Sequence, residues 1–228
     1  MSFFVTKVVD DYGTTYSITG AGYTILVIAM LVLVLAAGLI GKKEQTKRIN
    51  TKSMIFAGLA MALAIVTSKI KFLDLPMGGS VTLLSMLFIC LIGYWYGLKI
   101  GLMTSIAYGF LQLIIDPYII SLPQVLLDYI FAFGALGLSG LFSNKKHGLI
   151  KGYIVGVVGR YICSVLSGVI FFGMYAPETM SPLTYSLAYN GVTIGAEGII
   201  TLIVIAIPPV AHAFTYVKGF ATDQQSLA

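Results

Sequence analysis

The sequence predicts an all-α integral membrane protein, and three observations support this prediction. Of the 228 residues, 58% are hydrophobic and 10% are charged, whereas a soluble domain has about 25% charged residues. The mean hydropathy is +0.94, and a single core of this size cannot hide so much apolar surface from water. Seven apolar runs approach the roughly 20 residues that cross a bilayer; they are 22–41, 53–70, 81–94, 100–115, 122–142, 152–174 and 188–209.

The first run, 22–41, is predicted to be a retained membrane helix and not a signal peptide. It starts late and follows an acidic segment with Asp10 and Asp11, whereas a signal peptide begins with a basic segment. The stretch GKKEQTKRINTK after it predicts a linker and a boundary. The third and fourth runs are short, and YWYGLKIG between them supplies interfacial aromatic residues and a tight turn.

Lysine and arginine positions predict the orientation, because cytoplasmic loops carry an excess of these residues. If residues 42–52 are cytoplasmic, the basic residues inside are Lys42, Lys43, Lys47, Arg48, Lys52, Lys99, Lys145, Lys146, Lys151 and Lys218. Outside are Lys7, Lys69 and Lys71, while Arg160 lies within a span. This bias predicts that the N-terminus is outside and the C-terminus is cytoplasmic.

The sequence lacks the common motifs of nucleotide, metal and nucleophile chemistry. It has no P-loop, HExxH, GxSxG or CxxC. Cys90 and Cys163 lie in apolar runs and are predicted to pack as small hydrophobic residues. His147 and His212 lie at predicted cytoplasmic helix ends. An intramembrane enzyme would need a base or metal ligands at membrane depth, so an enzyme is not expected, and neither is a cofactor.

One carboxylate, Asp128, lies in the sequence QVLLDYIFAFG inside the apolar run 122–142. A charge at the bilayer centre costs about 3 kcal/mol on insertion scales, and less near the surface. Asp128 is therefore either an interfacial acid reached by water or the counter-ion of a cationic ligand. The second interpretation is favoured because ionisable residues inside membranes are usually functional.

The run 152–174 carries a polar face. Arg160 precedes Ser164, Ser167 and Gly168 by four, seven and eight residues, so these residues share one side of a helix. Two interpretations stay open. Small residues often line helix contacts in lipid and Arg160 can extend towards the cytoplasmic surface, or this face binds a ligand.

The outer segment FFGMYAPETMSPLTYSLAYNG, 171–191, is dense in aromatic residues: Phe171, Phe172, Tyr175, Tyr185 and Tyr189. They fit an interfacial belt, or a site near a carboxylate where aromatic faces hold a cation or a flat heterocycle. Asn190 and Glu197 share a helix face. Glu197 either binds substrate or pairs with Arg160, and the structural role is favoured.

The stretch AGLAMALA, 57–64, has small residues four apart. Gly58 and Ala62 form one such pair, and Ala60 and Ala64 form another. This spacing lets another helix approach closely. The partner is either a helix of the same chain or a separate membrane protein, and composition does not choose between them.

Four segments occur in the order of a known family: LPMGGSVTLLSM, QVLLDYIFAFGALGLSGLF, SGVIFFGMYAP and MSPLTYSLAYNG. Over about residues 53–210 the chain resembles the thiamine-specific substrate-binding subunits, or S-components, of energy-coupling factor (ECF) transporters. The resemblance implies a six-helix S-component bundle at 53–228 with a thiamine site opening outward. Residues 1–52 then form an extracellular segment, one extra N-terminal transmembrane helix and a basic cytoplasmic linker. The implied location is the bacterial plasma membrane.

The resemblance also implies the ligand contacts, position by position. The family's acid–tyrosine pair falls on Asp128 and Tyr129, and its stacking aromatic falls on Phe172, where a tryptophan can stand. The other implied contacts are Arg160, Ser164, Gly168, Tyr185 and Asn190, with Ser164 replacing a histidine that many members have. The implied lid loop consists of Leu75, Pro76, Met77, Gly78 and Gly79.

The resemblance places no ATPase in this chain, so transport would need a membrane coupling protein and two cytoplasmic ATPases. The small residues Gly58, Ala60, Ala62 and Ala64 match the face with which the family docks on the coupling protein. Two alternatives remain, a self-powered secondary transporter and an S-component for another cationic or heterocyclic vitamin. A secondary transporter usually shows repeated halves or broken helices, and this sequence shows neither.

Overall fold

The computed structural model describes residues 5–10, 13–22, 24, 25, 28, 32, 51–75 and 79–222. The predicted span 22–41 therefore lies almost entirely outside the described residues, as does most of the linker after it. Pro76, Met77 and Gly78 of the predicted lid loop also lie outside them.

Helices dominate the described chain. The first half contains β1 (Val5–Asp10), β2 (Gly13–Ile18), α2 (Thr51–Ser68), β3 (Lys71–Asp74), β4 (Ser80–Thr82), α3 (Ser85–Tyr96) and α4 (Leu98–Ile115). One long helical segment follows, made of α5 (Leu122–Val125), η2 (Leu126–Phe131), α6 (Ala132–Gly134) and η3 (Ala135–Phe142). The second half contains α7 (Gly148–Phe171), η4 (Gly173–Tyr175), α8 (Pro182–Asn190), η5 (Gly191–Gly195), α9 (Ala196–Ala206) and α10 (Pro208–Ala221).

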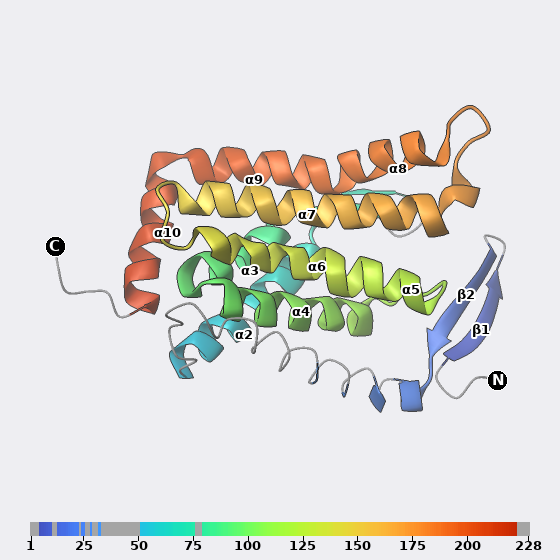
Figure 1. Cartoon of the computed structure of the whole chain (residues 1–228), viewed down its shortest axis with the longest axis horizontal. Helices are drawn as coiled ribbons and strands as arrows, with labels where there is room; N and C mark the ends of the chain where they lie inside the picture. Colours follow the sequence, from blue (N-terminus) through green and yellow to red (C-terminus); the bar gives the residue numbers. More distant parts are fainter. Residues whose placement is uncertain are drawn as a thin grey trace.

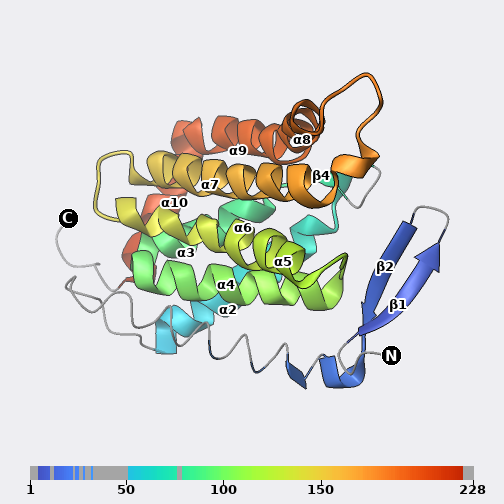
Figure 2. The ribbon, with the colours of Figure 1, turned by 45° about the vertical axis from the view of Figure 1, so that its right-hand side comes forward.

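Five helical segments are long and apolar enough to cross a membrane: Thr51–Ser68, Leu98–Ile115, Leu122–Phe142, Gly148–Phe171 and Pro182–Ala206. They coincide with five of the predicted apolar runs. Figures 1 and 2 show α4, α7, α9 and the segment from α5 to η3 running side by side. The prediction of a helical protein with several membrane spans is thus confirmed for the described residues.

The run 81–94 was predicted as a further span, but its helix, α3, has only 12 residues and begins at Ser85. Most of α3 is buried, and it contacts α2, α4, η3 and α7. A short apolar helix is more often a buried core helix than a complete span. Its side chains, such as Met86 and Ile89, are fully buried, so α3 forms the centre of the bundle.

The sequence did not predict two hairpins and the last helix. β1 pairs antiparallel with β2 from Val5–Ile18 to Asp10–Gly13, and β3 pairs antiparallel with β4 from Lys71–Thr82 to Asp74–Ser80. The run 188–209 ends at Ala206 because Pro208 and Pro209 cannot continue a helix. They open α10, which crosses the end of the bundle (Figure 1).

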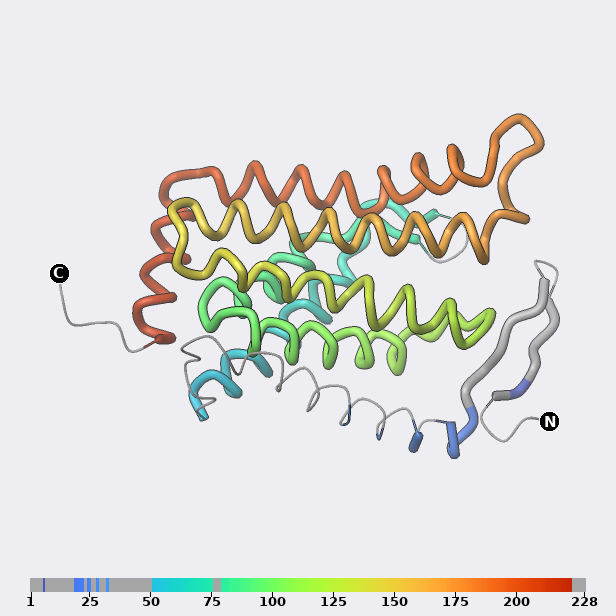
Figure 3. The backbone as a smooth tube through the Cα atoms, viewed as in Figure 1, coloured from blue at the N-terminus to red at the C-terminus, as the bar shows by residue number. Residues whose placement is uncertain are grey.

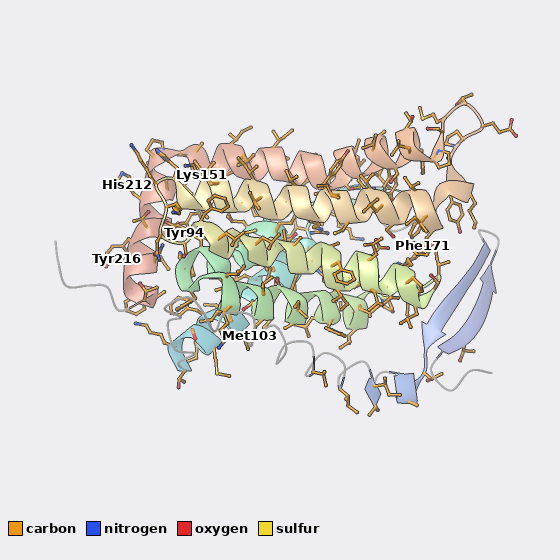
Figure 4. All side chains as sticks on the ribbon, in the orientation of Figure 1. Tyr94, Met103, Lys151, Phe171, His212 and Tyr216 are labelled. Atoms are coloured by element: carbon orange, nitrogen blue, oxygen red, sulfur yellow. The ribbon has the colours of Figure 1, made fainter. Side chains whose placement is uncertain are left out.

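The two ends of the bundle differ in their polar side chains. Lys218 of α10 donates to the Ser143 carbonyl and lies over the Tyr94 ring at 4.0 Å. Figure 4 shows Tyr94, Lys151, His212 and Tyr216 at this end and Phe171 near the other. Two lysines that the sequence assigned to the opposite side, Lys69 and Lys71, lie beside the cavity described below.

Glycines set the closest approach between helices in the half of the bundle near α10. A Cβ on Gly140 would lie 2.4 Å from the backbone nitrogen of Leu98, and one on Gly137 would lie 2.7 Å from Leu102. Both glycines belong to η3, an eight-residue 3-10 helix. The absence of side chains at these positions lets η3 contact α4 at backbone distance.

Candidate functional site

A cavity of about 380 Å³ lies between α7, the segments 122–142 and 182–206, the β3–β4 hairpin, the start of α3 and the ends of α2 and α4. In Figure 2 β4, α5 and α8 lie at the same end of the bundle. All eight residues that the resemblance implied as ligand contacts line this cavity: Asp128, Tyr129, Arg160, Ser164, Gly168, Phe172, Tyr185 and Asn190. The structure thus brings together residues from three helical segments, which are 122–142, α7 with the residue that follows it, and α8.

Asp128 and Tyr129 lie in η2, a π-helical turn inside the long segment 122–142. Such turns inside α-helices are frequently found at functional sites. The side-chain amide of the buried Gln124 donates to Asp128 Oδ2 at 2.7 Å. Among the described residues no lysine, arginine or histidine forms an ion pair with Asp128, so its carboxylate lines the cavity without a paired cation.

Tyr129 holds the chain between α4 and α5 in place. Its hydroxyl accepts a hydrogen bond from the Tyr118 N–H at 2.9 Å and donates to the Asp116 carbonyl at 3.0 Å. Both hydrogen-bonding capacities of this hydroxyl are used for structure. What Tyr129 offers to the cavity is therefore chiefly its aromatic ring.

Arg160 enters the cavity from the middle of α7. Its guanidinium lies 4.2 Å from the centroid of the Phe133 ring, a cation–π contact. It forms no ion pair with Asp128 or Glu197 in the described part of the chain, so the predicted pairing of Arg160 with Glu197 is wrong. Ser164 lies one turn further along α7 and also lines the cavity.

Gly168 permits close contact between α7 and α8. A Cβ at this position would lie 2.1 Å from Ser186 Oγ and 2.9 Å from Ser186 Cβ. Ser186 Oγ donates to the Val165 carbonyl at 2.9 Å, and Asn190 Nδ2 donates to the Ser186 carbonyl at 3.0 Å. Because Nδ2 is fixed by a carbonyl acceptor, Asn190 Oδ1 remains available as an acceptor for a ligand.

Phe172 follows the last residue of α7 and lines the cavity, whereas Phe171 does not. The Phe172 ring stacks on Tyr118, with centroids 5.8 Å apart and planes at 27°. Helical spacing from Ser164 favours Phe171, but α7 ends at that residue and the backbone turns. The resemblance implied that Phe172 is the stacking residue, and Phe172 is the one of these two phenylalanines that lines the cavity.

The predicted lid loop, Leu75–Gly79, joins β3 to β4, and only its two ends are described. The Leu75 N–H donates to the Gly79 carbonyl at 2.8 Å. The Gly79 N–H donates to the Tyr189 hydroxyl at 2.8 Å. A Cβ on Gly79 would lie 2.2 Å from that hydroxyl oxygen, so glycine is required where the hairpin meets α8.

Sequence reasoning missed several cavity residues, above all Gln124 and Tyr118. Gln124 had a usable signal, because it precedes Asp128 by one helical turn in an otherwise apolar run. Tyr118 lies in the short loop after α4 and carries no periodic signal. At the mouth, Lys69 pairs with Asp116 at 3.5 Å, a contact between distant segments.

The predicted docking face on α2 requires a correction. Ala60 and Ala64 are 6% and 0% exposed and belong to the main hydrophobic core, and α2 packs on α3. These two residues therefore mediate contact within the chain. Gly58 and Ala62 are exposed, and a Cβ on Gly58 would meet no atom within 4 Å.

The described residues contain no group of three or more His, Cys, Asp or Glu side chains that would hold a metal ion. The cavity is lined by aromatic rings, hydroxyls and amides, by the bases Lys69, Lys71 and Arg160, and by the acids Asp116, Asp128 and Glu197. Asp116 pairs with Lys69, whereas among the described residues Asp128 forms no ion pair. Such a site suits a small organic ligand that has a cationic, planar part.

Known proteins agree with this description. The family model for "Thiamine transporter protein (Thia_YuaJ)" matches residues 54–216. The chain is 36% identical over 167 residues to the Thiamine transporter ThiT of Bacillus subtilis, covering 67% of this chain and 85% of that protein. It is 26% identical over 175 residues to the Thiamine transporter ThiT of Lacticaseibacillus paracasei, covering 68% and 84%.

A solved structure of ThiT from Listeria monocytogenes superimposes with a TM-score of 0.53 at 27% sequence identity. The match covers 69% of this chain and 93% of that one. The family match extends from α2 into α10 and contains every described residue that lines the cavity. The chain belongs to the thiamine transporter (Thia_YuaJ) family.

Proposed function

We propose that this chain is the thiamine-binding S-component of an ECF transporter and that the cavity around Asp128 holds the vitamin. The single observation that carries the proposal is the carboxylate of Asp128. It lies within a membrane span, lines the cavity, accepts a hydrogen bond from the neutral Gln124 amide and forms no ion pair in the described residues. A permanent cation is the ligand chemistry that such an acid favours.

Thiamine fits this cavity in charge and shape. It carries a positive thiazolium ring and an aminopyrimidine with hydrogen-bond donors and acceptors. Asp128 pairs with the cation or accepts from the amine, in surroundings that strengthen the interaction relative to water. Phe172 and Tyr185 supply aromatic faces, and Asn190 Oδ1 supplies an acceptor. The volume of about 380 Å³ lies within the usual range for small-ligand sites, roughly 300–1,000 Å³.

Uptake in this proposal requires partners outside the chain. A membrane coupling protein and two cytoplasmic ATPases provide the energy, because the sequence contains no phosphate-binding loop. The protein is placed in a bacterial plasma membrane, with the cavity facing outward. The lysine bias of the sequence supports a cytoplasmic C-terminus.

Cells that lack other thiamine uptake test the division of labour. With the chain alone they should bind thiamine at the surface and not accumulate it. Adding the coupling protein and ATPases should restore ATP-dependent accumulation. Accumulation by the chain alone would favour a secondary transporter and overturn the proposal.

The aromatic residues that line the cavity lead to a prediction about Phe172. Phe172→Ala should weaken thiamine binding by about 1–3 kcal/mol, the usual value for stacking on an aromatic side chain. Ser164→Ala should cost only about 0.5–1.5 kcal/mol, the net contribution of a neutral hydrogen bond. Phe171→Ala is the matched control, since Phe171 precedes the cavity residue and does not line the cavity. A larger loss from Phe171→Ala, measured by calorimetry, would show that the register is wrong.

The exposed face of α2 gives a prediction about partner docking. Ala62→Trp should leave thiamine binding nearly unchanged and strongly reduce uptake in cells carrying the whole transporter, because Ala62 is exposed and does not line the cavity. The buried Ala64→Trp is expected to disturb folding of the chain itself, since the residue is 0% exposed. Normal uptake by a well-folded Ala62→Trp variant would remove α2 from the docking surface.

A further inference from the structure

Glu197 is an acid inside a membrane span whose role differs from that of Asp128. It lies in the first turn of α9 and is 4% exposed. Burying a carboxylate is costly unless its oxygens receive hydrogen bonds. No lysine, arginine or histidine pairs with Glu197 in the described chain, so neutral donors must stabilise it.

Three donors surround Glu197, and all come from the junction between β4 and α3. Thr82 Oγ1 donates to Oε2, Ser85 Oγ donates to Oε1 at 2.9 Å, and the Met86 N–H donates to Oε1 at 3.0 Å. The Met86 N–H belongs to the first turn of α3, where backbone N–H groups have no partner within the helix. A negative charge is also favoured there by the helix dipole.

At the junction between β4 and α3, the N-terminus of α3 has no side-chain cap from its own N-cap residue. Leu84 is the N-cap residue of α3, and its side chain cannot accept a hydrogen bond. Its φ of 57° lies in the left-handed region, which costs a non-glycine residue roughly 1 kcal/mol or more. Glu197, in α9, therefore caps the N-terminus of α3, because the residue before that helix has no side chain that can do so. It also stabilises the strained backbone at Leu84.

The same helical segment also holds the other end of β4. Figure 3 shows α8 and α9 continuing into one another as a single helical rod. In this rod, the Tyr189 hydroxyl accepts a hydrogen bond from the Gly79 N–H just before β4. The Glu197 carboxylate accepts one from the Thr82 hydroxyl at the end of β4. Gly79, Thr82, Ser85 and Met86 all line the cavity, as does Glu197 itself, so the rod holds the part of the cavity lining that β4 and the start of α3 provide.

We infer that Glu197 is a positioning residue for the ligand site. Its carboxylate fixes the β4–α3 junction, and through that junction it sets the cavity shape that thiamine requires. The inference rests on the proposed function, because it assigns Glu197 a role in the same thiamine site. Asp128 is the acid that meets the ligand, whereas Glu197 acts through Thr82, Ser85 and Met86.

The test compares two substitutions at Glu197 in the purified full-length chain. Glu197→Ala removes every acceptor and should weaken thiamine binding at least about tenfold, since bonds to charged groups are worth about 1.5–3 kcal/mol. Glu197→Gln keeps an acceptor for Ser85 and Met86, and its amide can donate to the Thr82 hydroxyl. It should stay within about threefold of wild type if positioning is what matters.

Hydrogen exchange of the peptide 82–90 without ligand supplies a second readout. Exchange should be faster in Glu197→Ala and near wild type in Glu197→Gln, because only the alanine variant frees the Met86 N–H. Thr201→Ala is the matched control: Thr201 lies one turn further along α9, is 0% exposed and does not line the cavity. It should change neither affinity nor this exchange.

Three outcomes would overturn the inference. One is wild-type affinity in Glu197→Ala, and another is wild-type exchange in that variant. The third is a Glu197→Gln variant as weak as Glu197→Ala, which would mean that the charge itself meets the ligand. If Glu197→Ala does not fold, Thr82→Val combined with Ser85→Ala removes two donors and must still weaken binding and speed exchange. A wild-type chain that binds no thiamine would refute the proposed function, while the exchange data would still test the junction.

Discussion

Asp128→Asn is expected to weaken thiamine binding by about 1.5–3 kcal/mol, the range for hydrogen bonds to charged groups. This corresponds to a loss of affinity of roughly 10- to 150-fold. Asparagine keeps the size of the side chain and can still accept from the Gln124 amide, which donates to Asp128 Oδ2 at 2.7 Å. The helix should therefore insert and fold normally, and calorimetry measures the loss directly.

Asp116→Asn is the matched control for this substitution. Asp116 lines the same cavity, but its side chain is 67% exposed and pairs with Lys69. Exposed ion pairs contribute about 0–1 kcal/mol, so the affinity of this variant should change little. If Asp128→Asn binds like wild type while the protein stays folded, Asp128 is an interfacial acid and the assignment of the site is wrong.

Gly168→Ala is expected to have the next largest effect, through the contact between α7 and α8. The new Cβ would lie 2.1 Å from Ser186 Oγ, which is held by its hydrogen bond to the Val165 carbonyl. Relieving this contact requires a helix shift that costs about 1–3 kcal/mol. The shift also moves Asn190, which donates to the Ser186 carbonyl. Both the melting temperature and the thiamine affinity should fall.

Gly195→Ala provides the control for this substitution. Gly195 lies in the same rod, and a Cβ there would meet no atom within 4 Å. Its melting temperature and affinity should stay close to wild type in the same detergent. Unchanged values for Gly168→Ala would show that α7 and α8 do not need this close contact.

The apolar runs predicted most of the membrane helices because hydrocarbon thickness fixes the length that a span requires. The same criterion overestimated 81–94, since a short apolar stretch also fits a helix buried among others, as α3 is. The prolines at 208 and 209 were visible in the sequence and mark the helix break before α10. The β3–β4 hairpin gave no alternating pattern over its few residues and was not predicted.

The candidate site was predicted from two different kinds of information. Physical reasoning identified Asp128, because a charge inside a membrane span is costly and such residues are usually functional. Helical spacing placed Ser164 and Gly168 on the same face as Arg160, the resemblance implied that they and Phe172 contact the ligand, and the cavity is lined by all three. The family match also confirms a transport protein and not an enzyme. The roles of individual ligand contacts stay predictions until the variants are measured.

Other features required three-dimensional contacts that no local pattern encodes. The donors of Glu197 lie more than 100 residues away in the chain. Ala60 and Ala64 have the same spacing as Gly58 and Ala62, yet the first pair is buried and the second is exposed. Sequence periodicity shows which residues share a face of a helix. It does not show which face packs against other helices of the same chain and which stays exposed.

Isothermal titration calorimetry of the purified chain with thiamine tests directly whether this protein binds the vitamin. Calorimetry is preferred to tryptophan fluorescence because the single tryptophan, Trp95, packs against Phe56 and does not line the cavity. We expect saturable binding of one thiamine per chain and no ATP hydrolysis by the same sample. Absence of heat with thiamine, together with clear binding of a different vitamin, would contradict this expectation.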